Sequence, residues 1–422
     1  MTYTLPDFKK FFSLLVIICF SQITLAQKTK KAIFVIVDGI PADVLKKVKT
    51  PTLDAIAKIG GYAKAHVGGD KGTYSETPTI SAVGYNSLLT GTWVNKHNVT
   101  DNNIAEPNYH YGTIFRFFKE QYPNKKTAIF STWLDNRTKL VGDNLPATGN
   151  LPIDYHFDGL ELDTVKYPHD RESNYIQQID EAVVNTAVAH ITKEAPDLSW
   201  VYLQYTDDMG HKYGDSLPFY NAVEMMDAQM GRLWEAIQIR EKSFNEDWEI
   251  WITTDHGREA ATGQGHGGQT ARERNTWIVT NAADLNDYFK TGNPGIVDIM
   301  PSIARFLNIT IPRESLMEID GTPLTGKSYF KDLRLRTSGG ELLVTWRALE
   351  TKGSVRIYVS TTNHFVKGAK DNYLLLTTVP LKKEEATIDI SKLPSYFYKV
   401  VIETQGTLLN KWIRLKKLPA KQ

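Results

Sequence analysis

Acidic and imidazole side chains follow three of the apolar segments in this chain. Asp38 follows the segment AIFVIV, Asp255 and His256 follow WEIWITT, and Asp207 and His211 lie just beyond VYLQYT. A single aspartate in such a position is usually a helix cap or a turn residue. Three strand ends that each supply an aspartate are different, because ligands of open parallel sheets bind beyond the carboxyl ends of the strands. We therefore expect these side chains to converge on one crevice.

A sixth residue of the same kind, His266, lies in the glycine-rich segment GQGHGGQ, where small neighbours let an imidazole approach a bound ion. Aspartate and histidine without cysteine suit zinc or a similar divalent ion. Three carboxylates and three imidazoles are enough for two ions with coordination positions left open. Without metal, the acids would repel one another and raise their own pKa values. The pattern predicts a two-metal site.

A nucleophile for phosphoryl transfer is expected in the segment 76–93. Hydroxyl side chains in this segment include those of Thr77, Thr79, Ser81, Ser87 and Thr90. The N-terminus of a helix favours a phosphate because its backbone N–H groups are unpaired and its dipole is positive there. Ser81 opens a predicted helix that runs through Leu88 and Leu89. The alternative is that Ser81 is only an N-cap, and the local sequence leaves both readings open.

The elements that must position these residues are those of a large α/β domain. Apolar runs that read as buried strands cover residues 32–37, 127–130, 200–205, 249–253 and 276–280. Runs that are apolar on both faces fit a mostly parallel sheet flanked by helices. Residues 176–187 and 220–239 repeat apolar side chains at helical spacing, including Met226 and Met230, which we expect to be core rather than ligands. We assign residues 27–328 to this domain.

The C-terminal part has a different pattern of apolar and polar residues. From residue 333 onward, short alternating runs are separated by Gly, Asn, Lys and Pro, which predicts an all-β sandwich over residues 333–417. Trp346 in an early strand and Tyr398 in a late one resemble a fibronectin type III domain. No chemistry is evident there, and we expect this domain to act as a spacer.

The N-terminus reads as a signal peptide covering residues 1–26. Lys9 and Lys10 precede an apolar run too short to span a membrane, and cleavage is expected after Ala26. The only cysteine, Cys19, lies inside this run, and the bulky Ile18 before it argues against lipidation. The protein is therefore expected to be exported, periplasmic or secreted, with no cysteine and no membrane span once the signal is removed. The net charge of +1 favours neither nucleic acid nor an anionic membrane as a partner.

The whole set of residues resembles the alkaline phosphatase superfamily, and within it the type I phosphodiesterase and nucleotide pyrophosphatase group, over about residues 30–328. The stretches DDMGHKYG and DHGR carry the resemblance. It implies an alkaline phosphatase-like fold and two zinc ions, with Ser81 Oγ close to the second ion. The ligands implied for the first zinc are Asp207, His211 and His266, and those for the second are Asp38, Asp255 and His256. The family nucleophile lies nine residues before a Thr-Gly pair, here Thr90-Gly91, which selects Ser81 over Thr79.

Two further residues carry over from the same resemblance. Asn102 lies five residues after His97, the spacing of a family asparagine that hydrogen-bonds a phosphate oxygen. It is also compatible with a simple turn. Arg137 is a candidate for the cation that monoesterases of the superfamily add, although a solvated arginine would look the same.

The chain departs from the phosphodiesterase pattern after Ser81. That group usually has an aromatic residue and then Pro-Asn-His, whereas this chain has Ala82, Val83, Gly84 and Tyr85. The missing aromatic weakens the case for a stacked nucleotide base, and Gly84 is closer to some monoesterases. Sulfatases are disfavoured because no Cys/Ser-x-Pro-x-Arg pattern surrounds Ser81.

The function expected from the sequence is zinc-dependent hydrolysis of small phosphate esters through a phosphoseryl intermediate on Ser81. A phosphodiesterase or nucleotide pyrophosphatase is the first choice, and a phosphate monoesterase on the same site is the alternative. A non-catalytic phosphate- or glycan-binding protein is the remote third.

Overall fold

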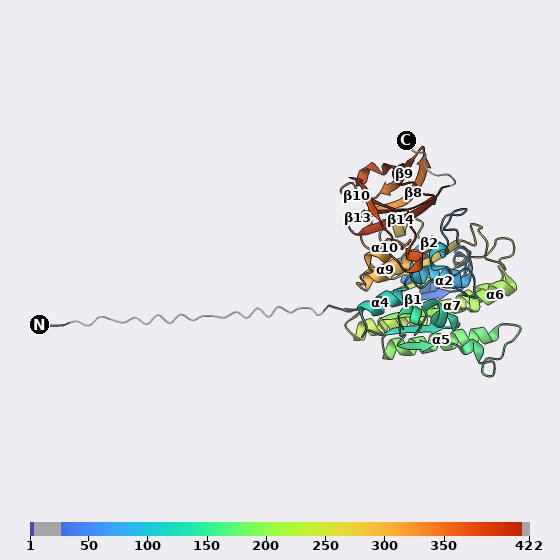
Figure 1. Ribbon diagram of the computed structural model, residues 1–422. Helices are drawn as coiled ribbons and strands as arrows, with labels where there is room; N and C mark the ends of the chain where they lie inside the picture. Colours follow the sequence, from blue (N-terminus) through green and yellow to red (C-terminus); the bar gives the residue numbers. More distant parts are fainter. Residues whose placement is uncertain (4–26, 416–422) are drawn as a thin grey trace.

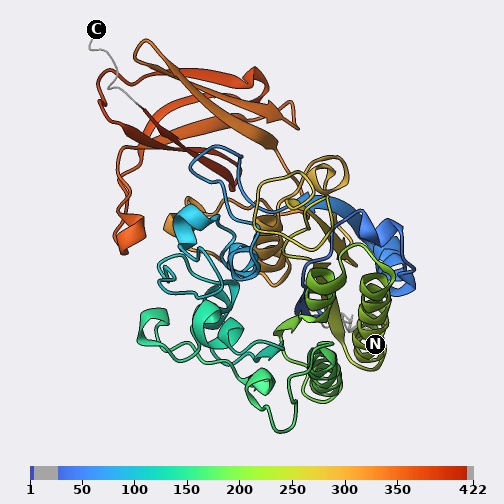
Figure 2. The same cartoon turned by 90° about the vertical axis from the view of Figure 1, so that its right-hand side faces the viewer.

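The computed structural model describes residues 1–3 and 27–415. Residues 4–26, which make up nearly all of the predicted signal peptide, lie outside the described residues. Within those ranges no helix combines the length and the apolar character needed to cross a membrane. Figures 1 and 2 show two parts: a large α/β region, and a C-terminal β-sandwich that lies against one side of it.

The α/β region is built on a seven-stranded sheet with the order β2-β7-β6-β1-β5-β3-β4. Its strands are β1 (Thr29–Val37), β2 (Gly61–His66), β3 (Thr127–Ser131), β4 (Tyr155–Phe157), β5 (Leu198–Leu203), β6 (Glu246–Thr253) and β7 (Asn275–Thr280). The pairs β1–β5, β1–β6, β3–β5 and β3–β4 are parallel, and only β7 runs antiparallel to its neighbours β6 and β2. The predicted mostly parallel sheet is confirmed.

The sequence of the central strand β1 is apolar because both of its faces are buried. Alternate side chains of a strand point to opposite faces. Phe34 and Ile36 enter one buried apolar core, whereas Ile33 and Val35 enter the other. A sheet covered on both faces needs apolar residues at every position, and this strand meets that need.

Helices cover both faces of the sheet (Figure 1). The first face carries α2 (Ser81–Thr90), α4 (Ile114–Gln121) and α9 (Ile299–Phe306), and the second carries α1 (Pro51–Ile59), α5 (Asn174–Lys193) and α7 (Leu217–Ser243). The remaining α-helices are α3 (Val94–His97), α6 (Tyr205–Tyr213), α8 (Asp287–Thr291) and α10 (Arg313–Leu316). Met226 and Met230 on α7 are buried in the core, as predicted.

The C-terminal residues form two antiparallel sheets, with the orders β12-β9-β8 and β11-β10-β13-β14. The strands are β8 (Phe330–Ser338), β9 (Glu341–Ala348), β10 (Ser354–Ser360), β11 (Leu374–Pro380), β12 (Glu385–Asp389), β13 (Phe397–Thr404) and β14 (Thr407–Arg414). Tyr398 is buried between the sheets, and its hydroxyl donates to the Leu393 carbonyl oxygen at 2.7 Å. Such a tyrosine corner is typical of immunoglobulin-like sandwiches. The more specific resemblance to fibronectin type III stays a prediction.

The sandwich is in close contact with the α/β region, which a simple spacer would not require. Lys399 of β13 is fully buried, and its Nζ lies 2.7 Å from Glu318 Oε1 of the α/β region and 2.7 Å from Asp371 Oδ2 of the sandwich. Lys96 Nζ, on α3, donates to Asn410 Oδ1 of β14 at 2.8 Å. The Tyr74 ring stacks on Trp412 with 5.4 Å between centroids. These contacts fix the sandwich against the segments that flank α2.

Candidate two-metal active site

The three central strands of the sheet bring the predicted residues together. Strand β1 ends at Val37, and Asp38 follows it, with its backbone N–H donating to the Leu203 carbonyl oxygen of β5 at 3.0 Å. Asp255 and His256 follow β6, the other neighbour of β1. Because β1, β5 and β6 are parallel neighbours, their carboxyl ends meet at one edge of the sheet.

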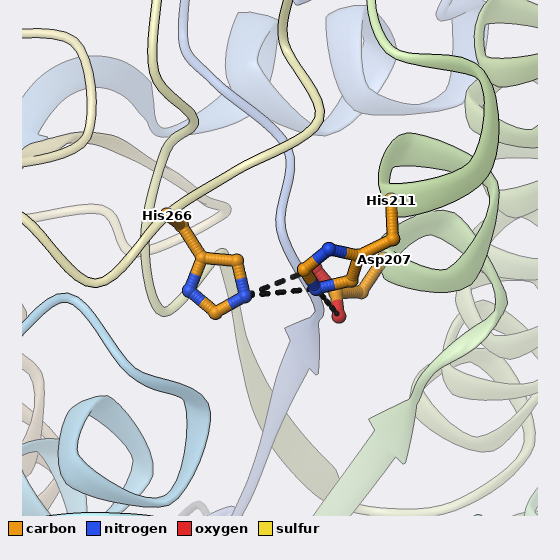
Figure 3. Close-up of side chains that lie close together, drawn as sticks. All are labelled: Asp207, His211 and His266. Carbon is orange, nitrogen blue, oxygen red and sulfur yellow. Dashed lines mark hydrogen bonds and ion pairs between the residues drawn. The ribbon is translucent and has the colours of Figure 1, made fainter.

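The first triad is formed by Asp207, His211 and His266 (Figure 3). Asp207 and His211 lie four residues apart on α6, so both point from the same helix face. The His211 Nε2 atom lies 3.2 Å from Asp207 Oδ2 and 2.9 Å from His266 Nε2. His266 reaches them from the loop between β6 and β7. Two imidazole nitrogens and a carboxylate at this spacing can hold one divalent ion.

The second triad is Asp38, Asp255 and His256, and all three residues are buried. His256 Nε2 lies 3.4 Å from Asp38 Oδ1 and 3.2 Å from Asp255 Oδ2. Both of these oxygens are buried, and within the described chain neither has a hydrogen-bond partner. A buried carboxylate oxygen without a donor is costly. A cation between the three side chains would satisfy both oxygens, so this triad fits a metal ion.

Hydrogen bonds on the outer ring nitrogens set the orientation of two histidines. His266 Nδ1 lies 2.8 Å from the Thr79 carbonyl oxygen, and His256 Nδ1 lies 2.9 Å from the Gly257 carbonyl oxygen. A carbonyl can only accept, so each Nδ1 carries the proton and each Nε2 presents its lone pair to the site. The His256 and His266 rings stack with 3.8 Å between centroids, which places the two triads side by side.

The carboxylates of the second triad have strongly perturbed protonation. Burial, and then the charge of Asp207, raise the pKa of Asp38 to about 7. Burial and the charges of Asp38 and Asp207 raise the pKa of Asp255 well above its ordinary value. These directions follow from acids that share a desolvated space, as expected from the sequence. A bound cation would favour the ionised form of both.

The other ligands are perturbed in ways that also suit metal binding. Burial, together with the neighbouring His266, lowers the pKa of His256 well below its ordinary value, so this imidazole is neutral near pH 7. Burial alone would raise the pKa of Asp207, but the His211 hydrogen bond and the Arg258 charge lower it below the ordinary range. Asp207 is therefore a carboxylate and His256 a free base, which are the forms that ligate a metal.

Ser81 is the first residue of α2, and its Oγ lies 3.4 Å from His256 Nε2. The close approach of this helix to the metal ligands depends on Gly84. A Cβ at position 84 would lie 2.9 Å from both the Cβ and the backbone oxygen of Asp255, which is closer than packed side chains allow. Gly84 thus has a packing role, which does not depend on whether the substrate is a monoester or a diester.

Thr79 and Asn102 lie on either side of this helix start. The Thr79 hydroxyl donates to the Gly268 carbonyl oxygen at 2.9 Å and accepts from the Gly267 N–H at 2.9 Å, so it is engaged with the loop that carries His266. Asn102 Oδ1 accepts a hydrogen bond from the Ala82 N–H at 2.9 Å. Asn102 is therefore brought to the N-terminus of α2, next to Ser81.

Arg137 is not brought into contact with either triad. It lies in the helical turn Asn136–Val141, and its guanidinium pairs with Asp158 at 2.6 Å and with Asp143 at 2.6 Å. Both acids are buried partners, so its charge is already balanced. These contacts give Arg137 a structural place in its own loop.

Three residues that the sequence reading did not single out hold the ligands in place. Arg258 is fully buried; it donates through Nε to the Gly39 carbonyl oxygen at 3.0 Å, through Nη1 to the Gln264 carbonyl oxygen at 2.8 Å, and through Nη2 to the carboxylate of Asp207. It thus ties together the three chain segments that carry the ligands. Its place in the DHGR stretch, two residues after His256, was the one sequence signal that could have pointed to this role.

The other two are tyrosines behind Asp38. The hydroxyls of Tyr85 on α2 and Tyr202 on β5 both contact Asp38 Oδ2, the latter at 2.7 Å, and the two hydroxyls lie 2.8 Å apart. They leave Asp38 Oδ1 to face His256. The sequence around them reads as ordinary helix and strand, so nothing in it pointed to this role.

Solved structures resemble the fold of this chain while sharing little of its sequence. A putative sulfatase from Bacteroides thetaiotaomicron VPI-5482 aligns with a TM-score of 0.51 at 13% identity, covering 86% of each chain. Human ectonucleotide pyrophosphatase/phosphodiesterase 5 aligns with a TM-score of 0.48 at 16% identity, covering 67% of this chain and 96% of the other. No curated protein sequence matches the chain.

A family model gives the assignment that structural likeness at such low identity cannot. The model that describes type I phosphodiesterase / nucleotide pyrophosphatase matches residues 32–308, which is well over half of the chain. This range contains both triads, Ser81 and Asn102. The chain belongs to the type I phosphodiesterase/nucleotide pyrophosphatase family.

Proposed function

We propose that this protein is a zinc-dependent phosphodiester hydrolase in which Ser81 is the nucleophile. The observation that carries the proposal is the place of Ser81: it opens α2, 3.4 Å from His256 Nε2, beside two adjoining triads that fit metal ions. Aspartate and histidine ligands without cysteine favour zinc. The first ion would be held by Asp207, His211 and His266, and the second by Asp38, Asp255 and His256.

The chain's own groups account for most of a double-displacement reaction. Ser81 Oγ attacks phosphorus, a Ser81–phosphorus ester forms, and the bond to the leaving oxygen breaks; the serine hydroxyl loses its proton and the leaving group departs as an alcohol that gains one. The Ala82 N–H already donates to Asn102 Oδ1, so the positive end of the α2 dipole, rather than this N–H group, would stabilise the charge of a phosphoryl group bound there. Water then cleaves the phosphoseryl ester and restores the hydroxyl. Zinc, when bound, would lower the pKa of the serine hydroxyl and neutralise charge on the transferred group.

Asn102 is proposed to bind a non-bridging phosphate oxygen. Its Oδ1 accepts from the Ala82 N–H at 2.9 Å, which fixes the side chain at the start of α2. The amide nitrogen of the same side chain is then left to donate. Such a donor stabilises charge that develops in the transition state.

A diester is favoured over a monoester because neither Arg258, which contacts Asp207, nor Arg137, the cation expected for a monoesterase, has an unpaired charge. Arg258 pairs with Asp207, and Arg137 pairs with Asp143 and Asp158. A monoester carries one more negative charge than a diester and needs an additional cation. Small phosphodiesters or nucleotides are the proposed substrates, and we also propose that the protein is exported through its N-terminal signal.

The test is paired kinetics on zinc-loaded protein with bis-p-nitrophenyl phosphate and p-nitrophenyl phosphate. The diester should be turned over at least about tenfold faster than the monoester. Removal of zinc with a chelator should abolish turnover, and added zinc should restore it. A faster monoester reaction would replace the diesterase assignment with a monoesterase, and turnover that survives complete removal of metal would refute the two-metal proposal.

A further inference from the structure

A large cavity lies between the sandwich and the α/β region, apart from the metal triads. Its volume is about 1580 Å³. Its walls come from β2, from the segment 69–75, from residues 269–275, and from strands β8 and β14 of the sandwich. None of the six candidate metal ligands lines it. Pockets for single small molecules usually measure about 300–1,000 Å³, so this one has room for a longer ligand.

Most charged side chains of this cavity that have no oppositely charged partner are basic. Arg334, Arg336 and Arg414 line it from the sandwich and are exposed, and Lys64 and Lys331 add to them. Within the described residues, none of these five side chains forms a hydrogen bond or an ion pair. Three arginines and two lysines therefore face the cavity with their charge uncompensated.

Two of the four acidic residues of the same walls pair with lysines, and a third accepts two hydrogen bonds. Asp70 pairs with Lys411, and Asp320 pairs with Lys96. Asp298 accepts backbone N–H groups at both of its oxygens. In the described chain, Asp332 is the one acid of the lining without such a partner. The cavity therefore has a marked positive excess, although the whole chain carries a net charge of only +1.

We propose that this cavity binds a flexible chain that carries several phosphate or sulfate groups. The planar guanidinium of arginine donates two parallel hydrogen bonds to a tetrahedral oxyanion, which a lysine cannot do. Arg334 and Arg336 lie two residues apart on β8, so both project from the same face of the strand, and Arg414 comes from the nearby end of β14. This spacing lets successive anionic groups of one ligand meet successive arginines.

The segment 77–79 links the lining of the cavity to the first triad. Gln269 lines the cavity, and its Nε2 donates to the Thr77 carbonyl oxygen at 2.8 Å. Two residues further along, Thr79 supports His266. A ligand seated in the cavity would therefore lie beside the segments that position Ser81, but it would not occupy the catalytic centre.

The experiment is a binding titration on the full-length chain, by fluorescence anisotropy with labelled polyphosphate and, in parallel, labelled dextran sulfate. Wild type should bind at least one of them. The triple variant Arg334→Ser/Arg336→Ser/Arg414→Ser should bind at least about tenfold more weakly, and its affinity should fall less steeply with added salt. The matched control Lys382→Ser/Lys383→Ser/Lys392→Ser removes the same charge from exposed positions of the sandwich outside the cavity, and it should stay within about twofold of wild type.

Equal loss in both triple variants would overturn the proposal, because binding would then reflect only general charge. Binding of labelled poly-glutamate as tight as that of the two probes would overturn the assignment to phosphate or sulfate, and so would failure of wild type to bind either probe at low salt. Which of the two probes binds more tightly identifies the anionic group. Hydrolysis of bis-p-nitrophenyl phosphate is measured on the same samples, so a failure at the cavity is distinguishable from a failure of the proposed catalytic function.

Discussion

At the scale of single residues, the candidate metal ligands are held by side chains that lie outside both triads. Arg258 is the clearest case, because it joins Gly39, Asp207 and Gln264 through one buried guanidinium. A Cβ on Gly210 would overlap that guanidinium, which explains the glycine in DDMGH. Replacing such supporting groups typically costs 10- to 100-fold in metal affinity.

The first prediction concerns Arg258. Arg258→Met should weaken zinc binding by about 10- to 100-fold, because Asp207 loses its partner and is free to turn away from His211. Zinc affinity is measured by competition with a chromophoric chelator. Arg258→Lys keeps the positive charge but lacks the several N–H donors of the guanidinium. Its zinc affinity should therefore lie between those of Arg258→Met and wild type. As a control, Arg232→Met removes a half-exposed arginine paired with Glu181 and should leave zinc affinity unchanged. Wild-type zinc affinity in Arg258→Met would contradict the positioning role.

The second prediction concerns Asn102. Asn102→Asp keeps an oxygen that can accept from the Ala82 N–H, but it replaces the donating amide. It should lower kcat/KM for a diester by about 100-fold or more, since loss of one donor to a transition-state oxyanion has a cost of that order. Steady-state kinetics with bis-p-nitrophenyl phosphate measure the effect. If Asn102→Asp retains wild-type kcat/KM, the amide does not contact the substrate.

The convergence of the six candidate ligands could be predicted from the sequence because each lies within a few residues of a buried strand or in a glycine-rich loop. The pairing of Asp207, His211 and His266 came from the family resemblance, and the structure brings these three together. The supporting residues could not be predicted in this way. Tyr85 and Tyr202 are far apart in the chain and meet at Asp38 only after the sheet and α2 have packed.

At the scale of elements, the site depends on how closely α2 approaches the end of β6. Gly84 makes this approach possible, since a Cβ there would lie 2.9 Å from the Asp255 backbone oxygen. Residues Ala82 to Thr90 of α2 are also all buried, so the helix has little freedom to move aside. Ser81 is therefore held where the helix packing puts it.

The third prediction follows from this packing. Gly84→Ala should destabilise the fold by about 1–3 kcal/mol, the usual effect of overpacking, and should lower kcat as α2 shifts. Chemical unfolding and diester kinetics on the same preparation measure the two effects. Gly231→Ala on α7 is the control, because its Cβ would meet only the Thr52 side chain, whose hydroxyl would lie 3.1 Å away. Undiminished stability and kcat in Gly84→Ala would show that the approach is less tight than the structure indicates.

The principal strands and helices could be predicted because their periodicity is strong, but short elements could not. Strands β2 and β4 were missed: β2 is only half apolar, and β4 has three residues. The predicted strand 200–205 instead ends at Leu203, because α6 begins at Tyr205. Local sequence patterns do not show at which residue the strand ends and the following helix, which carries Asp207 and His211, begins.

At the scale of the whole molecule, hydrogen bonds and ion pairs join the sandwich to the α/β region. Lys96 contacts Asp320 and Asn410, and the Asp320 and Gly321 N–H groups donate to the Gly91 carbonyl oxygen just beyond α2. These links join residues up to 314 positions apart. Sequence periodicity carries no information about such contacts, which is why a spacer was expected.

The fourth prediction concerns this interface. Lys399→Met should lower the free energy of unfolding by about 3–5 kcal/mol, because Glu318 and Asp371 would keep buried charges without their cation. Denaturant unfolding measures the change. Adding Glu318→Gln to Lys399→Met should recover part of the loss. Lys370→Met removes a mostly exposed lysine that pairs with Glu314 and should change stability by less than about 1 kcal/mol. An equally small effect for Lys399→Met would contradict a supporting interface.

The most direct test of the central claim is a search for the covalent intermediate on Ser81. Zinc-loaded enzyme is quenched with acid during turnover of bis-p-nitrophenyl phosphate, digested and mapped by mass spectrometry. The account predicts a p-nitrophenyl phosphoryl adduct, the part of the diester that remains after one nitrophenolate leaves, on the peptide that contains Ser81, and its absence in Ser81→Ala, which should still bind zinc but lose turnover. An adduct on another residue, or a Ser81→Ala variant that hydrolyses the diester as fast as wild type, would contradict it.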